Sequence, residues 1–153
     1  MENSIVGREK EITELKKYLS SEQSEFIAVY GRRRVGKTFL IKELLEEQFC
    51  FRMTGKENAR LGEQLLNFSY ALSDFFDDNR VPKNWTEAFR MLSKNIEKHE
   101  EGAKIIFIDE LPWLDTQKSR FLLKQWKSLR TAIPLHQPLR LWSSMNRYLQ
   151  KQF

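Results

Sequence analysis

The sequence is poor in residues that build covalently linked, metal-held or membrane-spanning structures. Its 153 residues include one cysteine, Cys50, which excludes a disulfide framework and a cysteine-based zinc site. The longest apolar runs, at residues 26–30 and 105–108, are far too short to span a bilayer. Residues 1–4 lack the basic segment and apolar stretch of a secretory signal. We therefore expect a soluble, cytoplasmic protein with no role in a membrane.

The C-terminal part of the sequence lacks acidic residues and glycine. All 21 acidic residues lie at or before Asp115 and the last glycine is Gly102, whereas eight of the 26 basic residues follow Asp115. The hydrophobic share of 41% is too high for a disordered chain. The length suits one domain, and its composition changes near residue 115.

Hydrophobic periodicity predicts helices that alternate with strands. The expected helices cover residues 8–20, 37–48, 61–77, 84–101 and 117–130, and the expected strands cover residues 26–30, 49–53 and 104–109. In the second helix we expect Phe39, Leu40, Leu44 and Leu45 to face inward. This alternation predicts an α/β fold with a parallel sheet and flanking helices.

A phosphate-binding pattern joins the first predicted strand to the second predicted helix. Residues 31–38 match G-x-x-x-x-G-K-[ST], and a chance match is disfavoured by this strand–loop–helix context. Lys37 reaches the β- and γ-phosphates in such loops, and Thr38 offers its hydroxyl to Mg²⁺. In such loops the side chains at positions 32–34 point away from the phosphates. They are expected to form a solvated basic tip or, as the alternative, to contact nucleic acid. The predicted nucleotide-binding residues here are Gly31, Arg32, Arg33, Arg34, Val35, Gly36, Lys37, Thr38 and Phe39.

Two carboxylates follow the third predicted strand. Asp109 and Glu110 come after an apolar run, as in a Walker B segment; the alternative is an ordinary polar turn. Asp109 is expected to hold Mg²⁺ through a bound water, and Glu110 to orient and deprotonate an attacking water. The sequence therefore predicts nucleotide phosphates and Mg²⁺ as ligands, Glu110 and Lys37 as catalytic residues, and Thr38 and Asp109 at the metal.

Four segments together resemble the archaeal-type AAA+ ATPases, a P-loop NTPase family that also occurs in bacteria. They are residues 6–11 (VGREKE), residues 31–44 (GRRRVGKTFLIKEL), residues 53–55 (MTG) and residues 107–121 (FIDELPWLDTQKSRF). The resemblance covers residues 1–121 and implies a sheet of strand order 5-1-4-3-2, ATP hydrolysis and contacts between copies of the chain. It makes Val6, Gly7 and Arg8 candidate contacts of the adenine. An ion pair at the helix start is the alternative for Arg8.

The family pattern is lost after residue 121. The family continues to a hydrophobic fourth strand whose end carries the sensor-1 polar residue, whereas residues 139–145 read LRLWSSM. Arg140 is a poor occupant of a central strand, because a buried unpaired charge is costly. Ser143 or Ser144 is the candidate for sensor 1. We interpret residues 1–121 as the ATPase core, truncated after the Walker B region, and residues 122–153 as a divergent basic tail. An out-of-frame origin of that tail is our hypothesis.

Three functions follow from these patterns. The first is Mg²⁺-dependent ATP hydrolysis. The second is a nucleotide-binding module, or an inert remnant, with little or no turnover, since sensor 1, an arginine finger and a lid are not evident. The third is nucleic-acid binding through the basic tail, favoured by a sequence pI of about 9.3.

Overall fold

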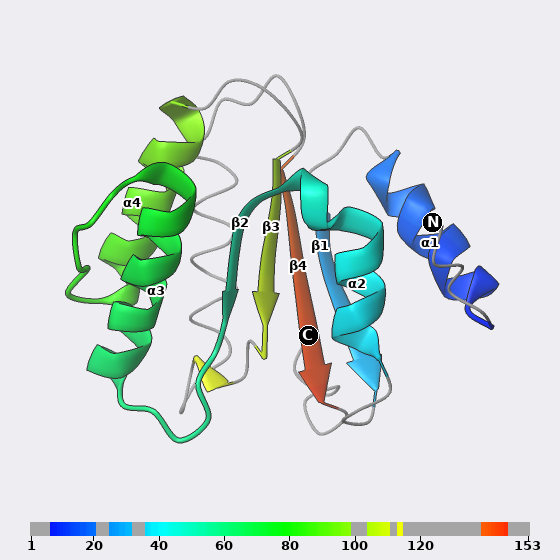
Figure 1. Cartoon of the computed structure of the whole chain (residues 1–153), viewed down its shortest axis with the longest axis horizontal. Helices are drawn as coiled ribbons and strands as arrows, with labels where there is room; N and C mark the ends of the chain where they lie inside the picture. The colour runs from blue at the N-terminus through cyan, green and yellow to red at the C-terminus, as the bar shows by residue number, and fades with distance from the viewer. Residues whose placement is uncertain are drawn as a thin grey trace.

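Helices and strands are interspersed along the chain (Figure 1). The computed structural model describes residues 7–20, 25–31, 36–98, 104–110, 113–114 and 139–146. The elements are α1 (Glu9–Leu19), β1 (Glu25–Gly31), α2 (Lys37–Leu45), a 3-10 turn (Glu46–Gln48), β2 (Phe49–Thr54), α3 (Leu61–Phe76), α4 (Trp85–Lys98), β3 (Lys104–Asp109) and β4 (Leu139–Asn146). Seven predicted elements are confirmed to within a few residues, and the helix predicted at 117–130 lies outside the described residues.

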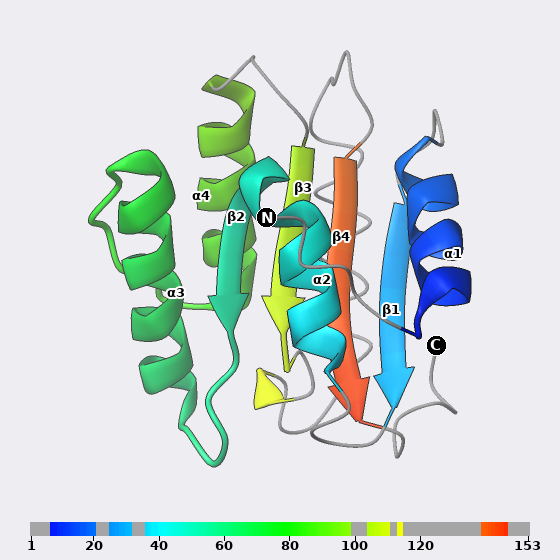
Figure 2. The ribbon, with the colours of Figure 1, turned by 45° about the vertical axis from the view of Figure 1, so that its right-hand side comes forward.

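The four strands form one parallel sheet of order β1-β4-β3-β2. Figures 1 and 2 show all four arrowheads at the same end of the sheet. The expectation that Arg140 disfavours a central strand is wrong, because β4 pairs with both β1 and β3. Arg140 is the second residue of the strand, in register with Glu25 and Ile105, and backbone groups form the ladder whatever the side chain. The order is the one that the resemblance implies for strands one to four.

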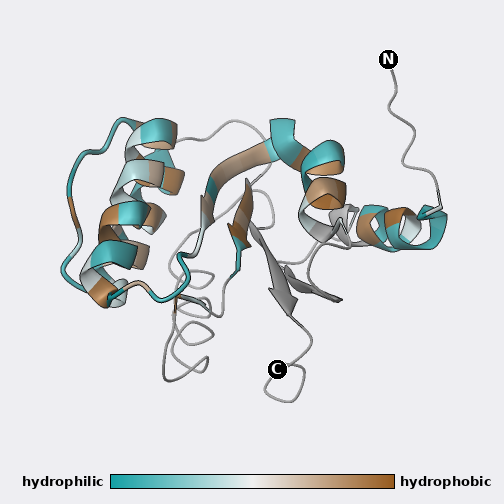
Figure 3. Ribbon diagram, turned by 60° about the horizontal axis from the view of Figure 1, so that its bottom comes forward, coloured by the Kyte–Doolittle hydropathy of each residue, from teal (hydrophilic) through white to brown (hydrophobic). Residues whose placement is uncertain are grey.

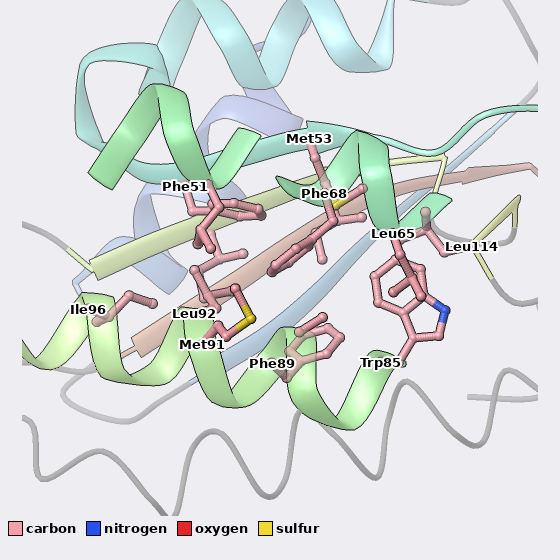
Figure 4. Close-up of a cluster of buried hydrophobic side chains, with 14 residues drawn as sticks. Phe51, Met53, Leu65, Phe68, Trp85, Phe89, Met91, Leu92, Ile96 and Leu114 are labelled. Atoms are coloured by element: carbon pink, nitrogen blue, oxygen red, sulfur yellow. The ribbon is translucent and has the colours of Figure 1, made fainter. Parts of the chain in front are cut away.

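Helices cover both faces of this sheet. Side chains of β3 alternate between the two cores: Ile106 and Ile108 pack toward α3 and α4, whereas Ile105 and Phe107 pack toward α1 and α2. Figure 3 shows the hydrophobic sides of α3 and α4 turned toward the sheet, and Figure 4 shows the larger core. No helix among the described residues is long and apolar enough to cross a membrane.

Helix α2 buries a narrower face than its sequence predicts. Leu40 and Leu45 are buried as expected, together with Ile41, but Phe39 is 55% exposed. At about 100° per residue, Phe39 lies almost opposite the centre of the buried face. The prediction that Phe39 faces inward is therefore wrong. Phe39 follows Thr38 in the first turn of α2, next to the phosphate-loop pattern, and its side chain is exposed there.

A hydrogen-bonded carboxylate fixes the connection between α3 and α4. Oδ1 of Asp78 accepts a hydrogen bond of 2.9 Å from Nε of Arg80, and Oδ2 lies 2.6 Å from Nη2 of the same guanidinium. Nδ2 of Asn95, on α4, donates to Oδ2 at 2.8 Å. These bonds hold the pKa of the Asp78 carboxyl well below its ordinary value, with the hydrogen bond from Arg80 as the largest cause. The connection is thereby tied to the inner side of α4.

Candidate functional site

The turn that leads into α2 requires a left-handed backbone. Gly36 has φ 78° and ψ 21°, a conformation that glycine adopts without steric cost. Its carbonyl oxygen accepts a hydrogen bond of 2.9 Å from the N–H of Leu40, so the helix begins directly after Gly36. The first N–H groups of a helix attract anions. Gly31 ends β1; Val6 and residues 32–35 (Arg32, Arg33, Arg34 and Val35) lie outside the described residues, and for Lys37 only the backbone, which opens α2, is described.

The start of α2 and the end of β3 meet through a hydroxyl and a carboxylate. Oγ1 of Thr38 donates a hydrogen bond of 2.9 Å to Oδ2 of Asp109. Oδ1 of Asp109 accepts a further hydrogen bond of 3.0 Å from the N–H of Glu110. Asp109 is only 7% exposed, and these hydrogen bonds satisfy both of its buried oxygens. A hydroxyl and a carboxylate in contact form an oxygen pair of the kind that Mg²⁺ prefers.

Glu110 occupies a strained backbone position beside this pair. Its φ is 52°, in the left-handed region that few residues other than glycine adopt. The N–H of Trp113 donates a hydrogen bond of 3.0 Å to the carbonyl oxygen of Glu110, which closes a turn. The side chain of Glu110 is half-buried. The structure thus brings Thr38, Asp109 and Glu110 to one end of the sheet, as the sequence predicts.

The segment after β2 packs against the turn at Glu110. The N–H of Gly55 donates to the carbonyl oxygen of Asp109 at 2.9 Å. A Cβ on Gly55 would lie 2.6 Å from the carbonyl oxygen of Glu110, so no side chain fits there. Gln64, on α3, is buried and hydrogen-bonds both Lys56 and the carbonyl oxygen of Trp113.

Sequence reasoning missed Gln64. The signal was available, because Gln64 lies four residues before Phe68 and eight before Leu72, the spacing of residues that share one face of a helix. A polar side chain on an apolar helix face requires hydrogen-bonding partners inside the fold.

The segment at the start of α1 lies beside the end of the phosphate-loop pattern. Gly7 has φ 84°, and its N–H donates a hydrogen bond of 3.3 Å to Oε1 of Glu9. A Cβ built on Gly36 would lie 3.8 Å from Nη2 of Arg8. The structure therefore places the Arg8 guanidinium close to Gly36, the residue before the first turn of α2.

The end of β4 contributes polar residues at the same edge of the sheet. Ser144 is in register with Asp109 of β3, and Asn146 is in register with Gly31 of β1. Ser143 is in register with Ile108, one position before the strand end of β3. Both serines are predicted from the sequence as sensor-1 candidates, whereas Asn146, which pairs with the last residue of β1, is not.

Comparisons with known proteins agree with this arrangement. The family of ATPase domains predominantly from Archaea matches residues 5–137, beyond the boundary of the resemblance at residue 121. The uncharacterized protein MJECL04 of Methanocaldococcus jannaschii is 34% identical over 108 residues, which are 71% of this chain and 22% of that protein. The uncharacterized ATP-binding protein MJ0423 of the same organism is 44% identical over 44 residues, which are 29% of this chain and 75% of that protein. The chain thus spans about a fifth of the first relative.

Proposed function

The chain belongs to the family of ATPase domains found predominantly in Archaea, and from this premise we propose that it binds ATP with Mg²⁺ and hydrolyses it. The observation that carries the proposal is the contact between Thr38 and Asp109. Their oxygens fit Mg²⁺, which is usually held by one or two protein groups together with water and phosphate oxygens. The name of the relative MJ0423 supports ATP as the ligand.

Each residue of the site has a proposed role in binding. Gly36 and the first N–H groups of α2 receive the phosphates, and Lys37 contacts the β- and γ-phosphates. The hydroxyl of Thr38 and the carboxylate of Asp109 would hold Mg²⁺ at the phosphates. The ion would neutralise charge on the phosphate oxygens.

Hydrolysis requires a base beside the γ-phosphate, and we assign that role to Glu110. Its carboxylate takes a proton from a water molecule while the water oxygen bonds to the γ-phosphorus. The bond from the γ-phosphorus to the bridging oxygen breaks, and ADP leaves. The position of Glu110 supports this role, because it directly follows Asp109, the last residue of β3.

We assign the domain to the AAA+ class, because its strand order follows the order that the resemblance implies. That class forms oligomers, and we extend this to copies of the present chain. The further nucleotide contacts that we propose are Val6, Gly7 and Arg8 toward the adenine, and Gly31, Arg32, Arg33, Arg34, Val35 and Phe39 in and after the phosphate loop. Ser143 or Ser144 is the proposed sensor-1 residue. The boundary at residue 121, the divergent character of residues 122–153 and the cytoplasmic location stay predictions, as does the activity of the whole protein.

The test is an equilibrium titration with Mg-ATP, followed by steady-state turnover. We expect saturable binding that is lost in Lys37→Ala and kept in Lys98→Ala, which changes an exposed lysine at the end of α4. Glu110→Gln should keep binding and lose turnover by about 10²- to 10⁴-fold. Equal binding by Lys37→Ala and the unaltered chain would overturn the assignment.

Two outcomes would favour the alternatives. Binding without turnover in the unaltered chain would mean a nucleotide-binding module. Salt-sensitive DNA binding that persists in Lys37→Ala, without any ATP binding, would favour the nucleic-acid function.

A further inference from the structure

We propose that Gln64 is a positioning residue for Glu110. It hydrogen-bonds both the segment after β2 and the turn after β3, and so fixes the backbone of the proposed catalytic base. The inference rests on the proposed hydrolysis of ATP. It starts from two observations, the hydrogen bonds of a buried amide and the left-handed backbone of Glu110.

Both N–H donors and the carbonyl oxygen of the Gln64 amide have hydrogen-bond partners, and all of these partners are backbone groups. Nε2 donates to the carbonyl oxygen of Lys56 at 2.7 Å and to that of Trp113 at 2.9 Å. Oε1 accepts from the N–H of Lys56 at 3.1 Å. A primary amide has two N–H donors and one carbonyl acceptor, so each is satisfied. Because Gln64 is 1% exposed, water cannot replace these bonds without opening the core.

The turn that Gln64 holds contains a backbone conformation that needs support. Glu110, with φ 52°, is strained, and such strain persists only where the surroundings fix it. Trp113 bonds to Gln64 through its carbonyl oxygen and to the carbonyl oxygen of Glu110 through its N–H. The backbone of Trp113 therefore links Gln64 to Glu110 through two hydrogen bonds.

Gly55 packs closely against the same turn. A Cβ at that position would be 2.6 Å from the carbonyl oxygen of Glu110 and 3.3 Å from Cβ of Trp113. The turn is therefore packed against the backbone of Gly55 and hydrogen-bonded to the amide of Gln64. Thr38 and Asp109 are joined by their own hydrogen bond, which does not include Gln64. Loss of the Gln64 amide should consequently displace the catalytic base Glu110, while the nucleotide still binds.

Two substitutions separate positioning from simple stabilisation. Gln64→Met keeps the length of the side chain and removes its hydrogen bonds. Gln64→Glu keeps the shape of the side chain, and only the protonated carboxyl of the variant can donate a hydrogen bond. The ATPase rate of this variant relative to the unaltered chain should therefore fall as the pH rises and this proton is lost. The matched control is Asn67→Ala, which removes a 2.7 Å bond from α3 to the carbonyl oxygen of Thr54 but none to the turn.

The measurements are kcat and KM for ATP, with Mg-ATP affinity measured separately. We expect kcat to fall about 10- to 100-fold in Gln64→Met, as for other misplaced catalytic groups, with Mg-ATP affinity within about twofold. Asn67→Ala should keep kcat. Unchanged kcat in Gln64→Met, an equal loss in Asn67→Ala, or loss of Mg-ATP binding in both Gln64 variants would overturn the positioning role. An unaltered chain without turnover would instead refute the proposed hydrolysis, and the positioning role with it.

Discussion

The hydroxyl of Thr38 hydrogen-bonds the carboxylate of Asp109 at 2.9 Å, although the two residues are 71 positions apart. The contact exists because α2 begins, and β3 ends, at the same edge of a parallel sheet. Ligands of open α/β sheets bind at this edge. The bond therefore unites the two motifs that the sequence presents separately, and its removal tests whether they act as one site.

Replacing Thr38 by alanine should weaken the magnesium dependence of ATP binding. The variant loses the proposed metal ligand and the donor that orients Asp109, and loss of a group that orients a metal ligand typically costs about 10- to 100-fold in metal affinity. Thr38→Ser keeps the hydroxyl and should bind as the unaltered chain does. Titrations with ATP in Mg²⁺ and in chelator give the ratio of affinities, and an unchanged ratio in Thr38→Ala would contradict the metal site.

Local patterns predicted the elements that form the site. The apolar run before Asp109 is one continuous segment, and so is the glycine-containing loop before Lys37. Periodicity and turn chemistry were therefore sufficient to predict β3 and α2. The strand at Leu139–Asn146 was not predicted, because its side chains argue against it and its stability comes from pairing with both β1 and β3. Such pairing depends on segments distant in sequence.

Gln64 illustrates the same limit within a helix. The helix itself was predicted, but the partners of Gln64 lie 8 and 49 residues away, at Lys56 and Trp113. No local pattern specifies them. Phe39 was placed wrongly for a different reason: in a helix of nine residues, one apolar residue more or less shifts the apparent centre of the hydrophobic face.

A methyl group at Gly55 should destabilise the domain. The added Cβ would lie 2.6 Å from a backbone oxygen of Glu110, and overpacking of this kind typically costs about 1–3 kcal/mol. Gly62→Ala is the matched control: nothing lies within 4 Å of its Cβ position on α3, so we expect a gain of about 0.4–1 kcal/mol. Urea unfolding of both variants measures the difference. Equal free energies of unfolding for Gly55→Ala and the unaltered chain would show that the turn at Glu110 can move aside.

Acid should selectively weaken the connection between α3 and α4. The Arg80 guanidinium holds the pKa of the Asp78 carboxyl below its ordinary value of 3.8, against the opposing effect of burial. A carboxyl with a lowered folded-state pKa stabilises the fold fully above its unfolded-state pKa, and this stability is lost as the pH falls through the folded-state pKa. Asp78→Asn should therefore be less stable at neutral pH, and its deficit should shrink as the pH falls from about 5 to about 2. Asp74→Asn, at an exposed position of α3, controls for the loss of one negative charge. Urea unfolding across this pH range gives both deficits, and a constant deficit for Asp78→Asn would show that its carboxylate form does not stabilise the connection.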